Sequence, residues 1–152
     1  MLEPLQGTVE DTTVERVVVT DAPTDMTGYR ALIESALKKG ADWYTFEDLA
    51  ERVRLGAMQF WPGVTSVILT EVQPFPRKKV LHCFLSAGNQ KELAVMGPPI
   101  LRWARAMGCT EATLYGRPGW ERSVFAKLGF KKLKMIAMSL PLEPWDEGDV
   151  CQ

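Results

Sequence analysis

The chain contains a single histidine, His82, and an imidazole is the side chain best suited to move a proton near neutral pH. Glu71, in the preceding apolar segment, is the other candidate for a general base. If the two segments form a hairpin that is symmetric about residues 73–78, Leu69 lies opposite His82 and Glu71 becomes its diagonal neighbour on the same face. A shift of one residue would separate the two side chains. His82 is therefore either a general base beside a carboxylate or a mid-strand residue satisfied by a neighbour.

A second polar cluster follows a short predicted strand at residues 112–115 and contains Arg117, Trp120, Glu121 and Arg122. Open α/β sheets tend to bind ligands just beyond their strand ends. Arg117 can pair with a carboxylate or phosphate, and Trp120 can cover an acceptor substrate. Trp120 can equally anchor a short helix on the sheet while its charged neighbours stay in solvent, so both interpretations remain open.

Apolar patterning predicts the elements that position these residues. Strands are predicted where short segments are rich in β-branched and apolar residues, and helices where apolar residues recur every three or four positions. The predicted strands are residues 14–20, 57–61, 64–72, 79–86, 112–115 and 131–140, and the predicted helices are residues 29–39, 45–55, 90–107 and 120–128. Pro98 and Pro99 lie inside the third helical pattern, which predicts a short turn over 90–96, a kink or restart near Gly97 and a main helix to Met107.

The order of these elements predicts an α/β (α+β) fold. Three consecutive strands form an antiparallel meander, and a helical crossover places the strand at 112–115 parallel to the one at 79–86. We expect one domain over residues 1–140, with an irregular arm at 1–13 and an acidic tail at 141–152. The tail carries Trp145 and is either disordered or a docking peptide.

Composition limits the function. The 152 residues are 46% hydrophobic and 24% charged, with a formal net charge of −1, as expected for one soluble globular domain. This balance disfavours a nucleic-acid partner, since such binders carry a positive field. Three dispersed cysteines form neither a disulfide framework nor a metal-binding pair, and no apolar run is long enough to span a membrane. We therefore expect a cytoplasmic protein with no metal and no membrane partner.

The element order resembles that of the GNAT-type N-acetyltransferases. The local match is closest at residues 124–130, Val-Phe-Ala-Lys-Leu-Gly-Phe, where that family has a segment ending in Leu-Gly-Phe. The loop at 116–122 is also similar to that of divergent GNAT-like proteins of tailed phages. The resemblance covers residues 26–140 in element order and 80–130 residue by residue. It implies a single GNAT-like domain with a mixed sheet of about six to seven strands and helices on both faces.

The resemblance also implies a cofactor, acetyl-CoA, bound between the two parallel strands. Backbone amides near Leu85 would hold the thioester carbonyl, and the helix start would hold the pyrophosphate, because a helix N-terminus presents unpaired N–H groups to an anion. The matching positions are Leu85, Ser86, Ala87, Gly88, Asn89, Gln90 and Lys91. The family's Gly-x-Gly or Gly-x-Ala is absent here, and the one glycine also suits a loop that only turns from strand to helix.

Phe125 stands where the family commonly has a tyrosine that protonates the departing thiolate, and Tyr115 is a possible substitute. Two functions follow. The first is an acetyl-CoA-dependent N-acetyltransferase on an unidentified amine, with Glu71 or His82 as base. The second is a catalytically inactive GNAT-fold phage structural or assembly protein that binds protein partners, including its own copies. A phage protein would reside in the host cytoplasm or the virion.

Overall fold

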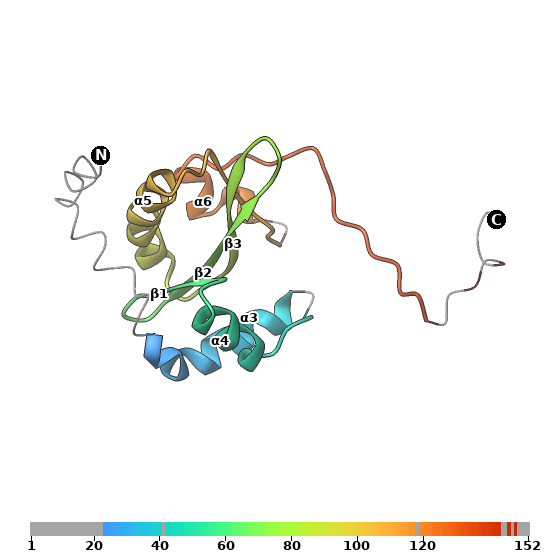
Figure 1. The fold of residues 1–152 in the computed structure, drawn as a ribbon, viewed down its shortest axis with the longest axis horizontal. Helices are drawn as coiled ribbons and strands as arrows, with labels where there is room; N and C mark the ends of the chain where they lie inside the picture. Colours follow the sequence, from blue (N-terminus) through green and yellow to red (C-terminus); the bar gives the residue numbers. More distant parts are fainter. Residues whose placement is uncertain (1–22, 41, 118, 144–145, 147, 149–152) are drawn as a thin grey trace.

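The sheet contains four strands, in the order β1-β2-β3-β4 (Figure 1). The computed structural model describes residues 23–40, 42–117, 119–143, 146 and 148. The strands are β1 (Gln59–Pro62), β2 (Val67–Pro74), β3 (Lys79–Ala87) and β4 (Glu111–Leu114). The first three pair antiparallel and β4 pairs parallel to β3, which confirms the predicted meander and crossover. The predicted strand at 14–20 and most of the acidic tail, including Trp145, lie outside the described residues.

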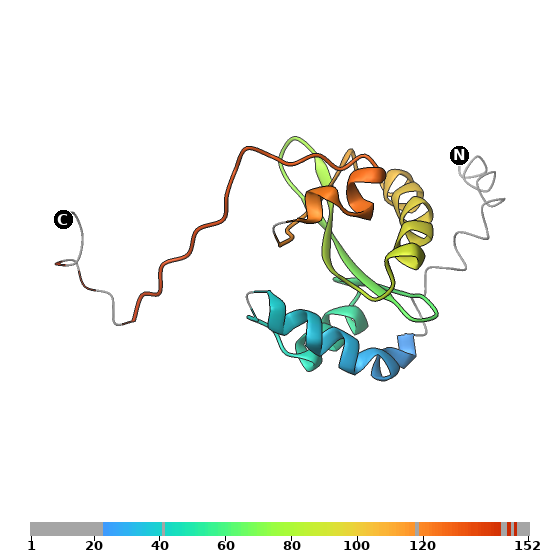
Figure 2. The ribbon, with the colours of Figure 1, turned by 180° about the vertical axis from the view of Figure 1, so that it is seen from behind.

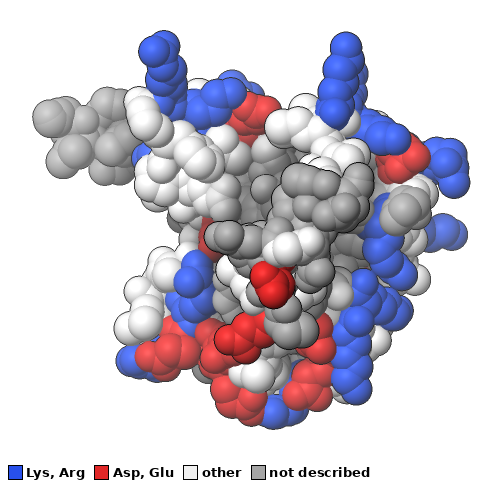
Figure 3. All heavy atoms as spheres, turned by 90° about the vertical axis from the view of Figure 1, so that its right-hand side faces the viewer, with Lys and Arg blue, Asp and Glu red and all other residues white. Residues whose placement is uncertain are grey.

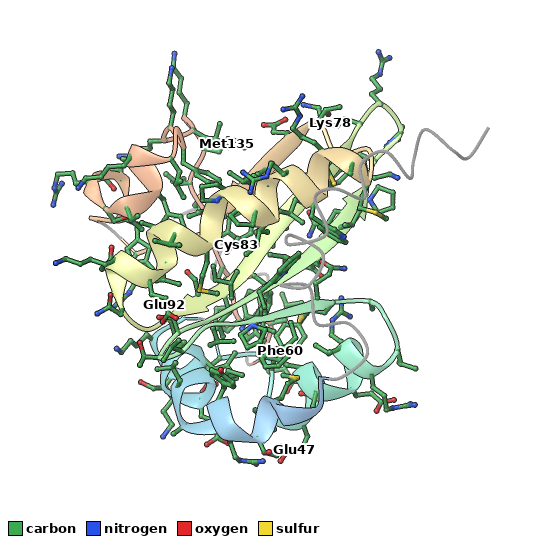
Figure 4. All side chains as sticks on the ribbon, turned by 90° about the vertical axis from the view of Figure 1, so that its left-hand side faces the viewer. Glu47, Phe60, Lys78, Cys83, Glu92 and Met135 are labelled. Carbon is green, nitrogen blue, oxygen red and sulfur yellow. The ribbon has the colours of Figure 1, made fainter. Side chains whose placement is uncertain are left out.

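Two helices cover one face of the sheet. A 3₁₀ segment, Pro23–Tyr29, leads into α3 (Arg30–Lys39), and α4 (Phe46–Arg54) follows. Thr45 caps α4 in a complete capping box with Asp48, which fixes the helix start that the sequence predicted. The apolar faces of both helices pack on Phe60, Leu69 and other buried residues of the sheet. Figure 4 shows Phe60 between the strands and this helical layer.

The other face is covered by α5 (Gln90–Ala106), a short 3₁₀ turn (Trp120–Arg122) and α6 (Val124–Lys127) (Figure 2). Trp61, Leu81, Ile100 and Phe125 are among the buried residues of this second core. The sheet thus has helices on both faces, as the GNAT resemblance implied. None of the described helices is both long and apolar enough to cross a bilayer.

The predicted break in α5 is wrong, because the helix continues from Gln90 to Ala106 with both prolines inside it. Pro98 lies on the exposed side, and Val95, whose carbonyl has no N–H partner at Pro99, is 73% exposed, while Met96 and Ile100 keep packing on the core. Gly97 does not break the helix. A Cβ there would lie 2.7 Å from Leu128 Cδ1, so this glycine permits the close approach of α6.

The predicted strand at 131–140 does not form within the described part of the chain. These residues are extended and exposed, and they lead away from the domain (Figures 1 and 2). A strand exists only when its backbone groups find a partner. The described sheet therefore has four strands, fewer than the six to seven expected, and β4 is at its edge.

Candidate active site

The two parallel strands separate at one end of the sheet. Their pairing ends at Cys83 and Leu114, whereas β3 continues to Ala87 while still paired with β2. Beyond Leu114 the chain departs at Tyr115, which is 82% exposed. The side of residues 84–87 that faces away from β2 thus has no strand partner among the described residues. We call this region, formed by residues 84–87 and 115–117, the β3/β4 divergence.

A β-bulge lies at the start of the divergence. Leu69 pairs with Leu85 and the next residue, Thr70, pairs with Cys83, so Phe84 has no partner on β2. Phe84 and Leu85 consequently both pack toward the α3–α4 core, and Tyr44 contacts the Phe84 ring edge-on at a centroid distance of 5.0 Å. A bulge twists the strand and turns backbone groups out of the ladder. It therefore leaves Phe84 without a backbone partner on β2.

His82 lies beside the divergence, directly opposite Glu71. The predicted register, with Leu69 opposite His82, was wrong by two residues, and a shift of two keeps His82 and Glu71 on one face. His82 is 5% exposed. Its Nδ1 lies 2.9 Å from Thr113 Oγ1 on β4, and its ring lies 4.6 Å from the Tyr115 ring. Thr113 thus satisfies one ring nitrogen, and no partner for Nε2 is found in the described chain.

Burial sets the charge of His82. Desolvation lowers the pKa of the imidazole below its ordinary value of 6.5, and the negative charge of Glu71 partly opposes this shift. The ring is therefore neutral near pH 7. In the tautomer whose Nδ1–H donates to Thr113, Nε2 carries the lone pair, as a general base requires.

Glu71 is held by two side chains. Arg52 of α4 donates to its carboxylate at 2.7 Å, and Gln73 donates at 3.2 Å. Glu71 is thus one half of an ion pair that ties α4 to the sheet, and it acts on His82 through its charge. Arg52 and Thr113 were not identified from the sequence. Parallel pairing of the two strands would have suggested Thr113, but no local signal indicates Arg52.

The loop from β3 to α5 is occupied by its own contacts. Gly88 has a φ of +124°, and a Cβ there would lie 2.4 Å from Ser66 Oγ. Asn89 donates its N–H to Ser66 Oγ at 2.8 Å, and its side chain accepts from the amides of Lys91 and Glu92. The glycine is therefore required by the contact with Ser66, and Asn89 uses amides that an anion would otherwise bind.

Glu92 adds a negative charge at this helix start. Its carboxylate accepts from the backbone amides of Val64 and Thr65 in the turn between β1 and β2. Hydrogen bonding to the Ser66 side chain is the largest cause that lowers the pKa of Glu92 to about 2, and the hydrogen bonds from these amides are the next. Figure 4 shows Glu92 at the end of α5 that approaches this turn. The carboxylate is thus ionised at neutral pH and repels an anion at the first turn of α5.

The other candidates for the cofactor loop are placed as follows. Leu85 is buried in the α3–α4 core. Ser86 is buried, and its Oγ has no hydrogen-bond partner among the described residues. Burial raises the pKa of the Cys83 thiol to about 12, so this cysteine is a neutral thiol near pH 7. Gln90 and Lys91 are exposed.

Trp120 packs as part of the fold. Its ring stacks on Phe125 at 5.2 Å with an interplanar angle of 18°, and a Cβ on Gly116 would lie 2.5 Å from it. The structure therefore places Trp120 as an anchor of the short helical segment. Arg117 is exposed and lies just beyond β4, at the same end of the sheet as residues 84–87. Phe125 is buried between Trp120 and Phe130.

The charge on the face toward which residues 131–143 leave the domain is unevenly distributed (Figure 3). Asp and Glu gather over its lower half, on the α3–α4 side, and Lys and Arg are most numerous along the top and one edge. Across the described residues, no group of three or more His, Cys, Asp or Glu side chains is arranged to bind a metal ion.

Comparison with solved structures supports the fold. No family model and no curated protein matches the chain. Among solved structures, a probable acetyltransferase matches with a TM-score of 0.57 and 12% identity, covering 75% of this chain and 92% of its own. An aminoglycoside acetyltransferase from an uncultured soil metagenomic sample, in complex with sisomicin, matches with a TM-score of 0.55 and 9% identity. The match covers 86% of this chain and 92% of that protein. An acetyltransferase of Trypanosoma brucei matches with a TM-score of 0.54 and 13% identity, covering 74% of this chain and 94% of that protein. The chain therefore has the GNAT-like fold that its sequence resembles.

Proposed function

We propose that this protein transfers an acetyl group from acetyl-CoA to an amine at the β3/β4 divergence. The observation that carries the proposal is the end of the β3–β4 ladder beside a bulge and a buried, neutral imidazole. Acyl transfer needs open backbone donors near the reacting carbonyl and a base with a suitable pKa. Under this proposal, residues 84–87, which have no strand partner on the β4 side in the described chain, would supply the donors, and the neutral imidazole of His82 would be the base. The similarity in fold to acetyltransferases supports the same activity.

The residues fit one part of acetyl-CoA better than the other. The unpaired side of residues 84–87 would hold the acyl-bearing arm through backbone hydrogen bonds. The diphosphate would find the first turn of α5 already capped by Asn89 and charged by Glu92. Gln90 and Lys91 are the exposed side chains that remain for it. When bound, acetyl-CoA supplies an activated acetyl group.

The protein's own residues would handle the proton of the acceptor amine. His82 Nε2 accepts this proton, while Nδ1–H donates a hydrogen bond to Thr113 Oγ1 that holds the orientation of the ring. Glu71 stabilises the imidazolium through its charge, and Arg52 holds Glu71 in place. Acidic side chains on the α3–α4 side would attract a cationic amine. The ring of Tyr115 lies beside the imidazole, and its phenol would protonate the departing thiolate. Phe125 has no proton to donate.

Calorimetric titration with acetyl-CoA, followed by assays of thioester consumption with a panel of primary amines, tests this proposal. Binding and turnover are expected, with turnover reduced about 100-fold or more in His82→Gln while cofactor affinity is retained. Lys38→Gln, on the exposed surface of α3, is the matched control and should leave turnover unchanged. Turnover that is unaffected in His82→Gln would exclude this base.

A second candidate is a non-catalytic interaction module, such as a phage structural or assembly protein. The capped first turn of α5 and the buried Phe125 support it, because both remove groups that the enzyme would use. Absence of heat and of any thermal shift at millimolar acetyl-CoA would favour this candidate. A ligand at 100 times its dissociation constant stabilises a protein by about 2.7 kcal/mol, which is readily detected.

A further inference from the structure

An apolar cavity lies in the core between the sheet and the α5–α6 layer. Its volume is about 30 Å³, and its lining includes Leu81 and Cys83 of β3, Ala112 of β4, Ile100 of α5 and Phe125 of α6. One buried water needs about 10–15 Å³ and two or more polar partners. The cavity has the room but presents only apolar atoms, so it suits an apolar group better than water.

The two polar side chains of the lining leave it apolar. The hydroxyl of Thr70 accepts a hydrogen bond from Trp61 Nε1 at 2.9 Å and donates one to Gln59 Oε1 at 2.7 Å. The thiol of Cys83 is neutral near pH 7 and packs as a small apolar group. Neither group therefore offers a free polar atom to an occupant of the cavity.

The cavity adjoins the β3/β4 divergence at Cys83. Cys83 pairs with Leu114 in the last pair of the parallel ladder, so this part of the lining lies where the strands separate. Ser86 belongs to the stretch of β3 that is unpaired on the β4 side. Its hydroxyl partly opposes the effect of burial on the pKa of Cys83, so the two side chains are neighbours. The divergence and the cavity thus share a boundary at Cys83.

The cavity and His82 lie on opposite faces of β3. Side chains alternate along a strand. Leu81 and Cys83 belong to the core that α5 covers (Figure 4). His82 lies beside Glu71, whose carboxylate is held by Arg52 of α4 on the other face. A thioester carbonyl between the strands can therefore have its alkyl chain on one face while an amine approaches on the other.

We propose that this cavity receives the alkyl chain of the transferred acyl group, so that the protein takes propionyl-CoA and butyryl-CoA as well as acetyl-CoA. This inference rests on the proposed acyl transfer at the divergence. The cavity has about twice the volume that one water-sized group needs, which matches the two methylenes that distinguish butyryl from acetyl. Burial of these methylenes in an apolar lining favours the longer donors.

The bonds that form and break are those of acetyl transfer. The amine nitrogen forms a bond to the acyl carbon, and the carbon–sulfur bond breaks with its electron pair going to sulfur. His82 takes a proton from the amine, and the CoA thiolate gains one. The chain length changes only the contacts of the alkyl group with the cavity.

Calorimetric titration with acetyl-CoA, propionyl-CoA, butyryl-CoA and hexanoyl-CoA, without an amine, tests the proposal. Affinity should rise about fourfold with each methylene up to butyryl-CoA, or about 15-fold in all, and hexanoyl-CoA should gain nothing more. Ala112→Val adds two methyl groups to the lining and should remove the preference for butyryl-CoA while keeping the affinity for acetyl-CoA. Ala57→Val adds the same groups at an exposed turn and should keep the preference.

The outcomes separate this proposal from acetyl transfer itself. Equal affinities for acetyl-CoA and butyryl-CoA, or affinity that keeps rising with hexanoyl-CoA, would overturn the acyl cavity and leave acetyl transfer standing. Absence of binding by every thioester would overturn both.

Methyl NMR of the wild-type protein locates the chain without relying on a variant. The methyl groups of Leu81 and Ile100 should shift with butyryl-CoA by more than with acetyl-CoA. Those of Leu49, in the core on the other face, should respond equally to both. A difference between the two thioesters that appears only outside the lining would overturn the proposal.

Discussion

Gly88→Ala tests whether the glycine of the loop between β3 and α5 serves the fold or a ligand. Gly88 has a φ of +124°, a conformation that costs a non-glycine residue about 1–3 kcal/mol. An added Cβ would lie 2.4 Å from Ser66 Oγ, 2.5 Å from Ser66 Cα and 2.6 Å from Ser66 Cβ. Ser66 is fully buried and accepts the N–H of Asn89, so it cannot simply turn away.

Overpacking of this kind costs a further ~1–3 kcal/mol, which gives a predicted loss of about 2–6 kcal/mol in the free energy of unfolding. Gly129→Ala is the matched control. Gly129 has a φ of +108° and nothing within 4 Å of its Cβ position, so only the backbone cost of about 1–2 kcal/mol applies. Urea denaturation followed by tryptophan fluorescence, without any ligand, measures both values.

The two variants should therefore differ, with the larger loss of stability in Gly88→Ala. If Gly88→Ala lowers the free energy of unfolding no more than Gly129→Ala does, the contact with Ser66 is not the reason that position 88 requires a glycine. Ser66→Gly in the Gly88→Ala background removes Cβ and Oγ but leaves Cα in place. It should therefore recover only part of the loss.

Three further predictions concern the titratable groups. The folded-state pKa of His82 lies below 6.5, so the unfolded chain binds the proton first as pH falls. The free energy of unfolding should therefore decline below pH 6.5 until the folded-state pKa is passed. His82→Gln should lack this part of the pH dependence in urea denaturation. Glu71→Gln removes the charge that raises the pKa of His82, so imidazole titration by NMR should show a still lower pKa, and an unchanged or higher value would contradict the assignment. Glu92 has a folded pKa of about 2 against an ordinary 4.5, so its contribution is complete above pH 4.5 and is lost as pH falls toward 2. Glu92→Gln should flatten acid denaturation in that window.

Local signals predicted much of the fold. The capping box at Thr45 fixed the start of α4, and the turn after Pro74 fixed the hairpin of β2 and β3. The alternation of the strands placed Glu71 and His82 on one face even though the register differed by two residues. These features depend on residues close in sequence, so a single sequence contains them.

Features that depend on tertiary contacts were not predictable. The bulge at Phe84 is a feature of the pairing of β3 with β2, and the ion pair of Arg52 with Glu71 joins a helix to the sheet. The continuous α5 with two prolines depends on packing along its buried side. The segment at 131–140 has the pattern of a strand, but pairing requires an edge that the sequence does not identify.

Hydrogen exchange of residues 84–87 with and without acetyl-CoA is the direct test of a cofactor site at the β3/β4 divergence. Those amides that face away from β2 have no strand partner in the described structure, so we expect them to exchange readily without ligand and to be protected at saturating acetyl-CoA. The amides of β1 and of the β2 residues that pair with it should be unchanged. Equal exchange at residues 84–87 in both states, or protection confined to another part of the chain, would contradict a cofactor site at the β3/β4 divergence.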